Sequence, residues 1–211
     1  MVYISYAWDA RGTGVGSTIT QEGGRLFEER LLIAQKYLEK AYSLDQSDPN
    51  VPAQLITIAM GLGLNRKEVE KQFQRAILAD PTDHQAYLSK LVYLMPQWYG
   101  SKEEMFLFAR ESVRNAPPKS RIPLMLPVAH WEMYFQSGEN ASYFRDPKVW
   151  KELKEVYQVV MKSFPEAQNT RNWFAKAAYL AGDYEIAREE LKKIGDDWSK
   201  QAWGDKKPLK K

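Results

Sequence analysis

The feature that most constrains this chain is one apolar spacing that returns five times. In each set, a first residue is followed four and then seven positions later by two more apolar or small residues. Offsets of three and four place such side chains on one face of an α-helix. The sets are Ala34, Leu38 and Ala41; Val69, Phe73 and Ala76; Met105, Ala109 and Ser112; Leu153, Tyr157 and Val160; and Ala187, Leu191 and Ile194. Their last members are separated by 35, 36, 48 and 34 residues, and three of these values are close to the period of about 34 residues of helix-pair repeats.

Prolines and polar turns divide the chain between these sets. Pro81, Pro117 and Pro165 each follow a set by five residues, where a helix must end. The longest separation contains residues 136–147, which are polar and predict an inserted loop. Further helices are predicted between the sets, at 51–62, 83–95, 122–135 and 169–181. No stretch shows the apolar and polar alternation of a strand.

The last unit carries the clearest family resemblance. Gly182, Tyr184 and Ala187, preceded by a helix of small and aromatic residues, resemble the turn and second helix of a tetratricopeptide repeat. The resemblance implies antiparallel helix pairs stacked into a superhelix with a concave groove. We therefore expect an all-α, tetratricopeptide-like α-α solenoid of about nine to ten helices.

The expected organisation has three parts. A single helical-repeat domain of about five degenerate units is predicted over residues 23–203. Residues 1–22 are predicted to form a non-helical segment that docks on the repeats. Residues 204–211 are predicted to form a basic, disordered tail.

A second resemblance extends over nearly the whole chain. It rests on residues 7–12 (AWDARG), on 17–23 (STITQEG), on 90–94 (KLVYL), on 98–105 (WYGSKEEM) and on the pair Ala129-His130. These runs are similar to a bacterial family catalogued as domain-of-unknown-function family 4034. The resemblance implies a bacterial protein that is usually longer at its N-terminus and has no assigned activity, so it transfers no functional residues.

Composition limits the possible partners. Of the 30 basic residues, four lie in the last six positions, and without them 26 basic residues remain against 27 acidic ones. A nucleic-acid-binding protein carries a basic face, so no nucleic-acid partner is expected. No run of about 18 apolar residues exists, which predicts no membrane insertion. With no cysteine and two histidines, we predict no metal site and no other cofactor.

Few residues suggest a small-molecule pocket. Asp9 and Arg11, beside Trp8, form either an ion pair or backbone clasp that holds the N-terminal segment, or part of a pocket that could include His130. His130 is otherwise expected to be a hydrogen-bonded, partly buried histidine. The glycine-rich run at 12–17 lacks the lysine of a phosphate-binding loop and predicts a tight turn. No catalytic constellation is recognisable.

Alignment with the tetratricopeptide pattern predicts which residues line the groove. They are Tyr87, Lys90, Leu94, Asn172, Lys176 and Tyr179. The lysines, the asparagine and the tyrosines could bind a carboxylate or an acidic peptide. Trp98, in a loop with Tyr99, either covers the neighbouring helices or extends this surface, since tryptophan and tyrosine are frequent at binding hot spots.

These observations favour a protein- or peptide-binding module without catalytic activity. Two alternatives remain open at this point. One is an enzyme or small-ligand receptor with a cleft formed by the N-terminal segment and the repeats. The other is a structural spacer or oligomerisation part of a longer chain. The identity of the partner, the oligomeric state and the compartment are not decided by the sequence.

Overall fold

A computed structural model describes residues 2–14 and 16–204, and this part of the chain is helical without any strand. The described residues form twelve α-helices and two short 3-10 helices, whereas nine to ten helices were expected. They are α1 (Val2–Arg11), η1 (Gly16–Thr18), α2 (Gln21–Leu44), α3 (Asn50–Gly61), α4 (Arg66–Ala79), α5 (His84–Tyr93), α6 (Lys102–Arg114), η2 (Ile122–Leu124), α7 (Met125–Gln136), α8 (Ser142–Arg145), α9 (Pro147–Ser163), α10 (Gln168–Ala181), α11 (Tyr184–Ile194) and α12 (Lys200–Trp203). The predicted tail beyond Gly204 lies outside the described residues.

The chain forms two compact units, Met1–Met105 and Phe106–Lys211, where the sequence predicted one domain over 23–203. The boundary falls inside α6. The helices α2 to α5 belong to the first unit and α7 to α12 to the second.

The five spaced sets occupy the interior, as their periodicity predicts. Every member is buried or half-buried, and Ala76, Met105, Ala109 and Leu153 are fully buried. The proline stops also agree with the helix ends, since α4, α6 and α9 end shortly before Pro81, Pro117 and Pro165. Antiparallel neighbours such as α10 and α11 pack along their length.

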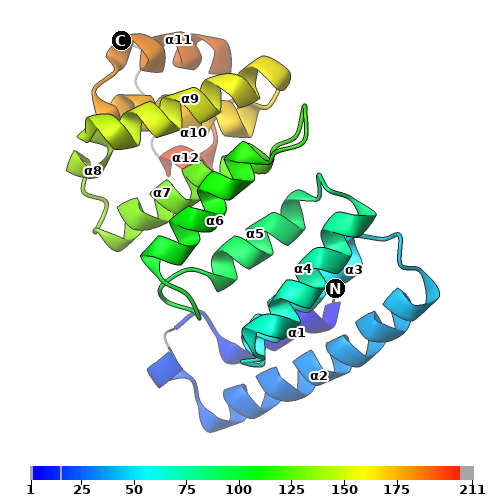
Figure 1. The fold of residues 1–211 in the computed structure, drawn as a ribbon. Coiled ribbons are helices and arrows are strands. Elements are labelled where there is room, and N and C mark those ends of the chain that lie inside the picture. The colour runs from blue at the N-terminus through cyan, green and yellow to red at the C-terminus, as the bar shows by residue number, and fades with distance from the viewer. Residues whose placement is uncertain (1, 15, 205–211) are drawn as a thin grey trace. The chain divides into compact units, whose positions relative to one another are not determined.

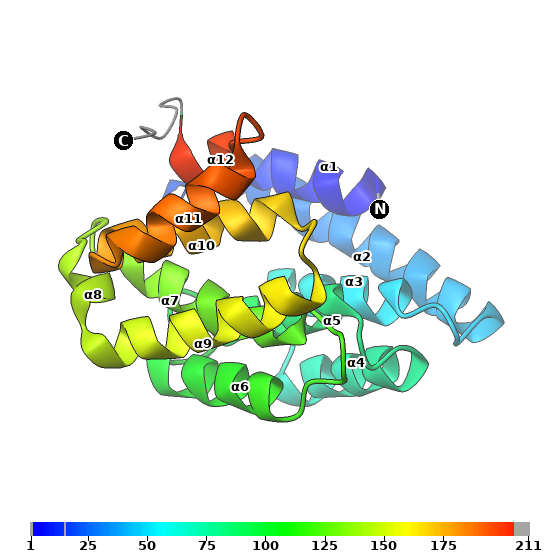
Figure 2. The same ribbon diagram turned by 90° about the horizontal axis from the view of Figure 1, so that it is seen from above.

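In the first unit, the prediction that residues 1–22 are non-helical is wrong, because residues 2–11 form α1. This helix lies along α2 in both views (Figures 1 and 2), and its Ile4 and Ala7 are buried against α2 and α3. The two helices approach closely at Gly23 of α2, because a Cβ atom there would lie 2.7 Å from the carbonyl oxygen of Ala10. Helix α2 begins where Thr20 Oγ1 accepts a hydrogen bond from the Gly23 amide, a standard N-cap.

Helix α3 forms the centre of the first unit. Most of its residues are buried, and it packs against α2, α4 and α5. At its C-terminal end Gly61 lies against α2, where a Cβ atom would be 2.5 Å from Leu31 Cδ1. The following helices α4 and α5 are capped by the side chains of Asn65 and Asp83.

In the second unit, aromatic side chains fill the core. Trp131, Tyr157 and Phe174 pack together, and the Trp131 indole N–H donates to the Tyr157 hydroxyl at 2.9 Å. The inserted segment 136–147 is more than a polar loop, since it contains α8. Phe144 of α8 is fully buried beside Trp131, so the insertion contributes to the core.

The α10–α11 hairpin is fixed by its turn. Gly182 takes a left-handed conformation (φ 86°) at the end of α10, which a glycine adopts without strain. Asp183 then caps α11 by accepting from the Ile186 amide. Its other carboxylate oxygen accepts from Trp150 Nε1 (3.1 Å) and Lys154 Nζ (3.2 Å) of α9. One aspartate therefore joins α9 to the start of α11.

None of the helices described is both long and apolar enough to cross a membrane.

Candidate functional site

The predicted groove residues of the first unit are engaged with their own neighbours. Lys90 Nζ binds Glu70 at 2.6 Å and lies 4.1 Å from the centre of the Phe73 ring. Burial opposes ionisation of Glu70, but hydrogen bonds from Lys90 and Gln74 outweigh it and lower its pKa. Leu94 is buried, and Tyr87 meets Phe73 edge to face. Burial raises the pKa of Tyr87.

Arg11 holds the turn that follows α1. Its Nη1 donates to the carbonyl oxygens of Gly12 (3.3 Å) and Gly14 (3.2 Å). Its guanidinium lies 5.4 Å from the Trp8 ring and 5.9 Å from the Trp98 ring, and these two indoles meet edge to face. Trp98 therefore packs against α1, whereas Asp9 is exposed.

His130 belongs to the second unit, unlike Asp9 and Arg11. It is 2% exposed, with Nδ1 2.8 Å from the Tyr143 hydroxyl and Nε2 3.1 Å from Glu152. Nε2–H can donate to the carboxylate, and the second hydrogen bond joins Nδ1 to the hydroxyl. Burial raises the pKa of Tyr143 to about 12. Burial opposes ionisation of Glu152, but bonds from Arg110 and His130 lower its pKa.

The remaining groove residues lie along one face of α10. Asn172, Lys176 and Tyr179 are spaced by four and three residues, so their side chains share a face. Asn172 is fully buried and Tyr179 is 56% exposed. Lys176 Nζ lies 5.5 Å from the Trp131 ring and 5.6 Å from the Trp173 ring, and burial lowers its pKa. The structure thus places these three together in the second unit, while Tyr87, Lys90, Leu94 and Trp98 belong to the first.

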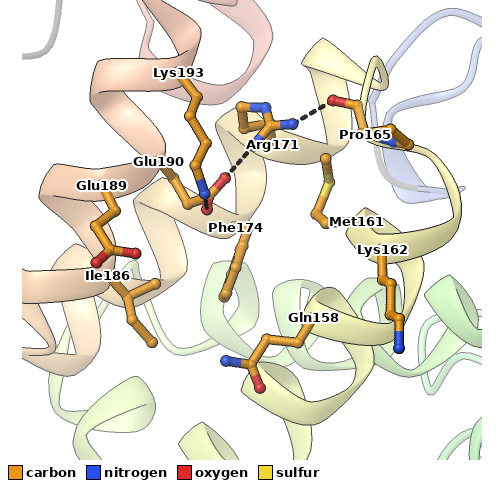
Figure 3. Close-up of a pocket in the computed structure, with 10 residues that line it drawn as sticks. All are labelled: Gln158, Met161, Lys162, Pro165, Arg171, Phe174, Ile186, Glu189, Glu190 and Lys193. Carbon is orange, nitrogen blue, oxygen red and sulfur yellow. Dashed lines mark hydrogen bonds and ion pairs between the residues drawn. The ribbon is translucent and has the colours of Figure 1, made fainter.

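The opposite face of α10 borders a hollow that the sequence did not predict. Figure 3 shows this open hollow, which is bordered by α9, α10 and α11 and measures about 450 Å³. We call it the α9–α11 hollow. Its lining residues are Gln158, Met161, Lys162, Pro165, Arg171, Phe174, Ile186, Glu189, Glu190 and Lys193.

The α9–α11 hollow combines an apolar interior with charged walls. Met161, Phe174 and Ile186 supply the apolar surface. Arg171 and Glu190 form a buried ion pair, and Lys193 Nζ binds the second oxygen of Glu190 at 2.6 Å (Figure 3).

Arg171 Nη2 also donates to the Pro165 carbonyl, while its buried Nε has no hydrogen-bond partner. Three cationic side chains (Lys162, Arg171 and Lys193) line the hollow with two carboxylates (Glu189 and Glu190), so the balance favours an anionic group.

One sequence signal could have indicated this hollow. Glu190 lies three residues after Ala187 and four before Ile194, which places it on the buried face of its helix. A carboxylate there requires a buried partner, and Arg171 is that partner. The other lining residues come from three helices and from Pro165 between α9 and α10, and their proximity depends on tertiary packing.

Comparisons with protein-family models, with curated proteins and with solved structures found no match to this chain. Within the described residues, no group of three or more histidine, aspartate or glutamate side chains is placed to hold a metal ion.

Proposed function

We propose that this chain is a protein- or peptide-binding module and that the α9–α11 hollow receives an apolar side chain of its partner. The observation that carries the proposal is the composition of the hollow. An apolar floor of Met161, Phe174 and Ile186 is surrounded by charged side chains of both signs with a cationic excess. Binding sites commonly combine apolar surface with a few placed polar groups.

The chemistry of the hollow favours a particular kind of segment. Burial of an aliphatic or aromatic side chain of the partner against this apolar floor is energetically favourable. Lys162 is exposed at the hollow and is available to a neighbouring carboxylate of the partner. We therefore propose a peptide with an apolar residue next to an acidic one. The tetratricopeptide-like stacking and the resemblance to a bacterial family remain parts of this proposal.

Selection from a displayed library of random peptides tests the proposal. We expect enrichment of sequences that pair an apolar with an acidic residue. Binding of a selected, fluorescein-labelled peptide should weaken about tenfold in Lys162→Glu, because reversing one charge near the ligand carboxylate costs about 1.4 kcal/mol.

Lys151→Glu is the matched control, since it makes the same change on an exposed residue of α9 outside the hollow. It should change the affinity less than twofold. Selected peptides that bind both variants and the wild type equally would show that the partner does not use the α9–α11 hollow.

A further inference from the structure

The buried amide of Asn172 binds a segment from the end of this same chain. Its Nδ2 donates to the carbonyl oxygens of Gln168 (2.9 Å) and Asp197 (3.1 Å). Its Oδ1 accepts from the Ser199 backbone amide (2.9 Å) and from the Trp203 indole (2.9 Å). All four hydrogen-bonding positions of the side chain are thus used.

Most of this recognition is directed at the main chain of the bound segment. The carbonyl of Asp197 and the amide of Ser199 flank one residue, so Asn172 binds that stretch as it could bind a separate extended peptide. Trp203 adds the one contact that depends on a particular side chain. The Ser199 hydroxyl lies 3.4 Å from Asn169 Oδ1, one turn before Asn172 on α10.

The segment is delimited by two glycines with positive φ. Gly195 (φ 61°) ends α11, and Gly204 (φ 69°) follows α12. Glycine adopts such angles without strain and offers little resistance to rotation. Helix α12 itself spans only four residues, and among them Ala202 alone is buried. The segment therefore depends on its contacts with α10 rather than on its own helix.

We propose that this face of α10 is a peptide-binding surface and that residues 197–203 occupy it in cis. The external ligand is a peptide that is extended where its main-chain carbonyl and amide meet Asn172 and that then turns, as α12 does, to bring an indole to the same side chain. It displaces the internal segment on binding. The proposal rests on the proposed peptide-binding function, but it concerns the face of α10 opposite the α9–α11 hollow.

This face of α10 has side chains that an external peptide could contact and that the internal segment does not use. Lys176 and Tyr179 continue the face of Asn172 toward the end of α10. Lys176 contacts two indole rings, and the charge of Glu139 only partly offsets the burial that lowers the pKa of this lysine. A longer ligand with an acidic residue gains a contact with this lysine, which helps it to compete with a tethered segment whose effective concentration is on the order of millimolar.

The test uses the chain's own segment as the probe. A synthetic peptide of residues 195–204 with an N-terminal fluorescein is titrated with the full chain and with the double variant Ser199→Pro/Trp203→Ala. The double variant loses two of the contacts that Asn172 makes in cis. We expect it to bind the peptide at least about tenfold more tightly than the wild-type chain does, because the competing internal segment is released.

Changes in the peptide keep the test independent of protein folding. A peptide with Trp203→Ala should bind the opened chain about tenfold more weakly. A peptide with Gln201→Ala, which changes an exposed residue, should bind like the parent peptide. Lys162→Glu in the opened chain should leave the affinity unchanged, which separates this surface from the α9–α11 hollow.

Three results would overturn the proposal. The opened chain could lose its helical circular dichroism, which would make the segment a permanent part of the fold. It could stay folded and fail to bind the peptide. It could also bind the peptide no better than the wild type, which would mean that the segment does not compete for this surface.

Discussion

Gly23 and Gly24 are adjacent on α2, but only one of them touches another helix. A Cβ atom on Gly23 would lie 2.7 Å from the Ala10 carbonyl oxygen and 2.9 Å from Thr20 Oγ1. The same atom on Gly24 would meet only Ile19 Cγ2, at 3.8 Å. The first contact forces a backbone shift, whereas the second is ordinary van der Waals contact.

The two alanine variants should therefore change stability in opposite directions. Gly23→Ala should lower the free energy of unfolding by about 1–3 kcal/mol, since it pushes α1 away from α2. Gly24→Ala should raise it by about 0.5–1 kcal/mol through helix propensity alone. Urea denaturation measures both values. A stabilised Gly23→Ala chain would show that α1 does not sit on α2 as described.

The hydrogen bond between Trp131 and Tyr157 gives a second prediction at this scale. Both side chains are buried, and burial raises the pKa of Tyr157 well above its ordinary value. Tyr157→Phe leaves the Trp131 indole N–H without a partner, which should cost about 1–3 kcal/mol of unfolding free energy. Tyr37→Phe is the control, because Tyr37 is exposed. Equal stability of the two variants in urea would contradict the prediction.

At the scale of elements, the repeated spacing predicted the long helices and missed the short ones. The five spaced sets lie in α2, α4, α6, α9 and α11, and the helices expected between them (α3, α5, α7 and α10) lie close to their predicted ranges. Helix α1 was missed because its apolar residues are not confined to one face. Only Ile4 and Ala7 are buried, while Val2, Tyr3 and Tyr6 are exposed. Its helical state depends on α2, which a local pattern does not reveal.

The site was less predictable than the fold, for the same reason. Alignment with the tetratricopeptide pattern placed Asn172, Lys176 and Tyr179 together on one helix. It could not show that Asn172 is bound by residues 25 to 31 positions later. Such contacts depend on where the chain returns after α11. The α9–α11 hollow likewise needs three helices in place before its lining residues meet.

Asp183 supports a prediction about pH, since it joins α9 and α11. Burial opposes its ionisation, but bonds from the Ile186 amide, Lys154 and Trp150 outweigh it and hold its pKa below the ordinary 3.8. A depressed carboxylate pKa stabilises the folded state above the unfolded pKa, and this stabilisation is lost as the pH falls through the folded pKa.

Asp183→Asn should thus be less stable than the wild type by about 1–2 kcal/mol at neutral pH. The difference should persist down to about pH 5 and shrink below about pH 4. Urea denaturation at a series of pH values measures it. A difference that stays constant to the lowest pH at which the chain folds would assign the effect to shape rather than to charge.

At the scale of the whole molecule, the division into two compact units has an energetic consequence. Gly23 and Tyr157 belong to different units, and the contacts described for each stay within its own unit. Changes without shared partners add to within about 0.5 kcal/mol.

The free energy of unfolding of the double variant Gly23→Ala/Tyr157→Phe should therefore fall by the sum of the decreases in the two single variants. Denaturation of all four chains in urea gives the comparison. A coupling energy of 1 kcal/mol or more would mean that the two units share part of their stability.

The dependence of α1 on its neighbours also matters during synthesis. A helix of ten residues is too short to persist alone in water, and α1 leaves the ribosome before α2 and α3. Ile4 and Ala7 are buried among residues of α2 and α3, and α3 is complete only when Gly61 has been added, about 50 residues later. At about 5–20 residues per second, this takes several seconds. During that interval the nascent α1 is an unfolded, aromatic-rich stretch that chaperones can bind.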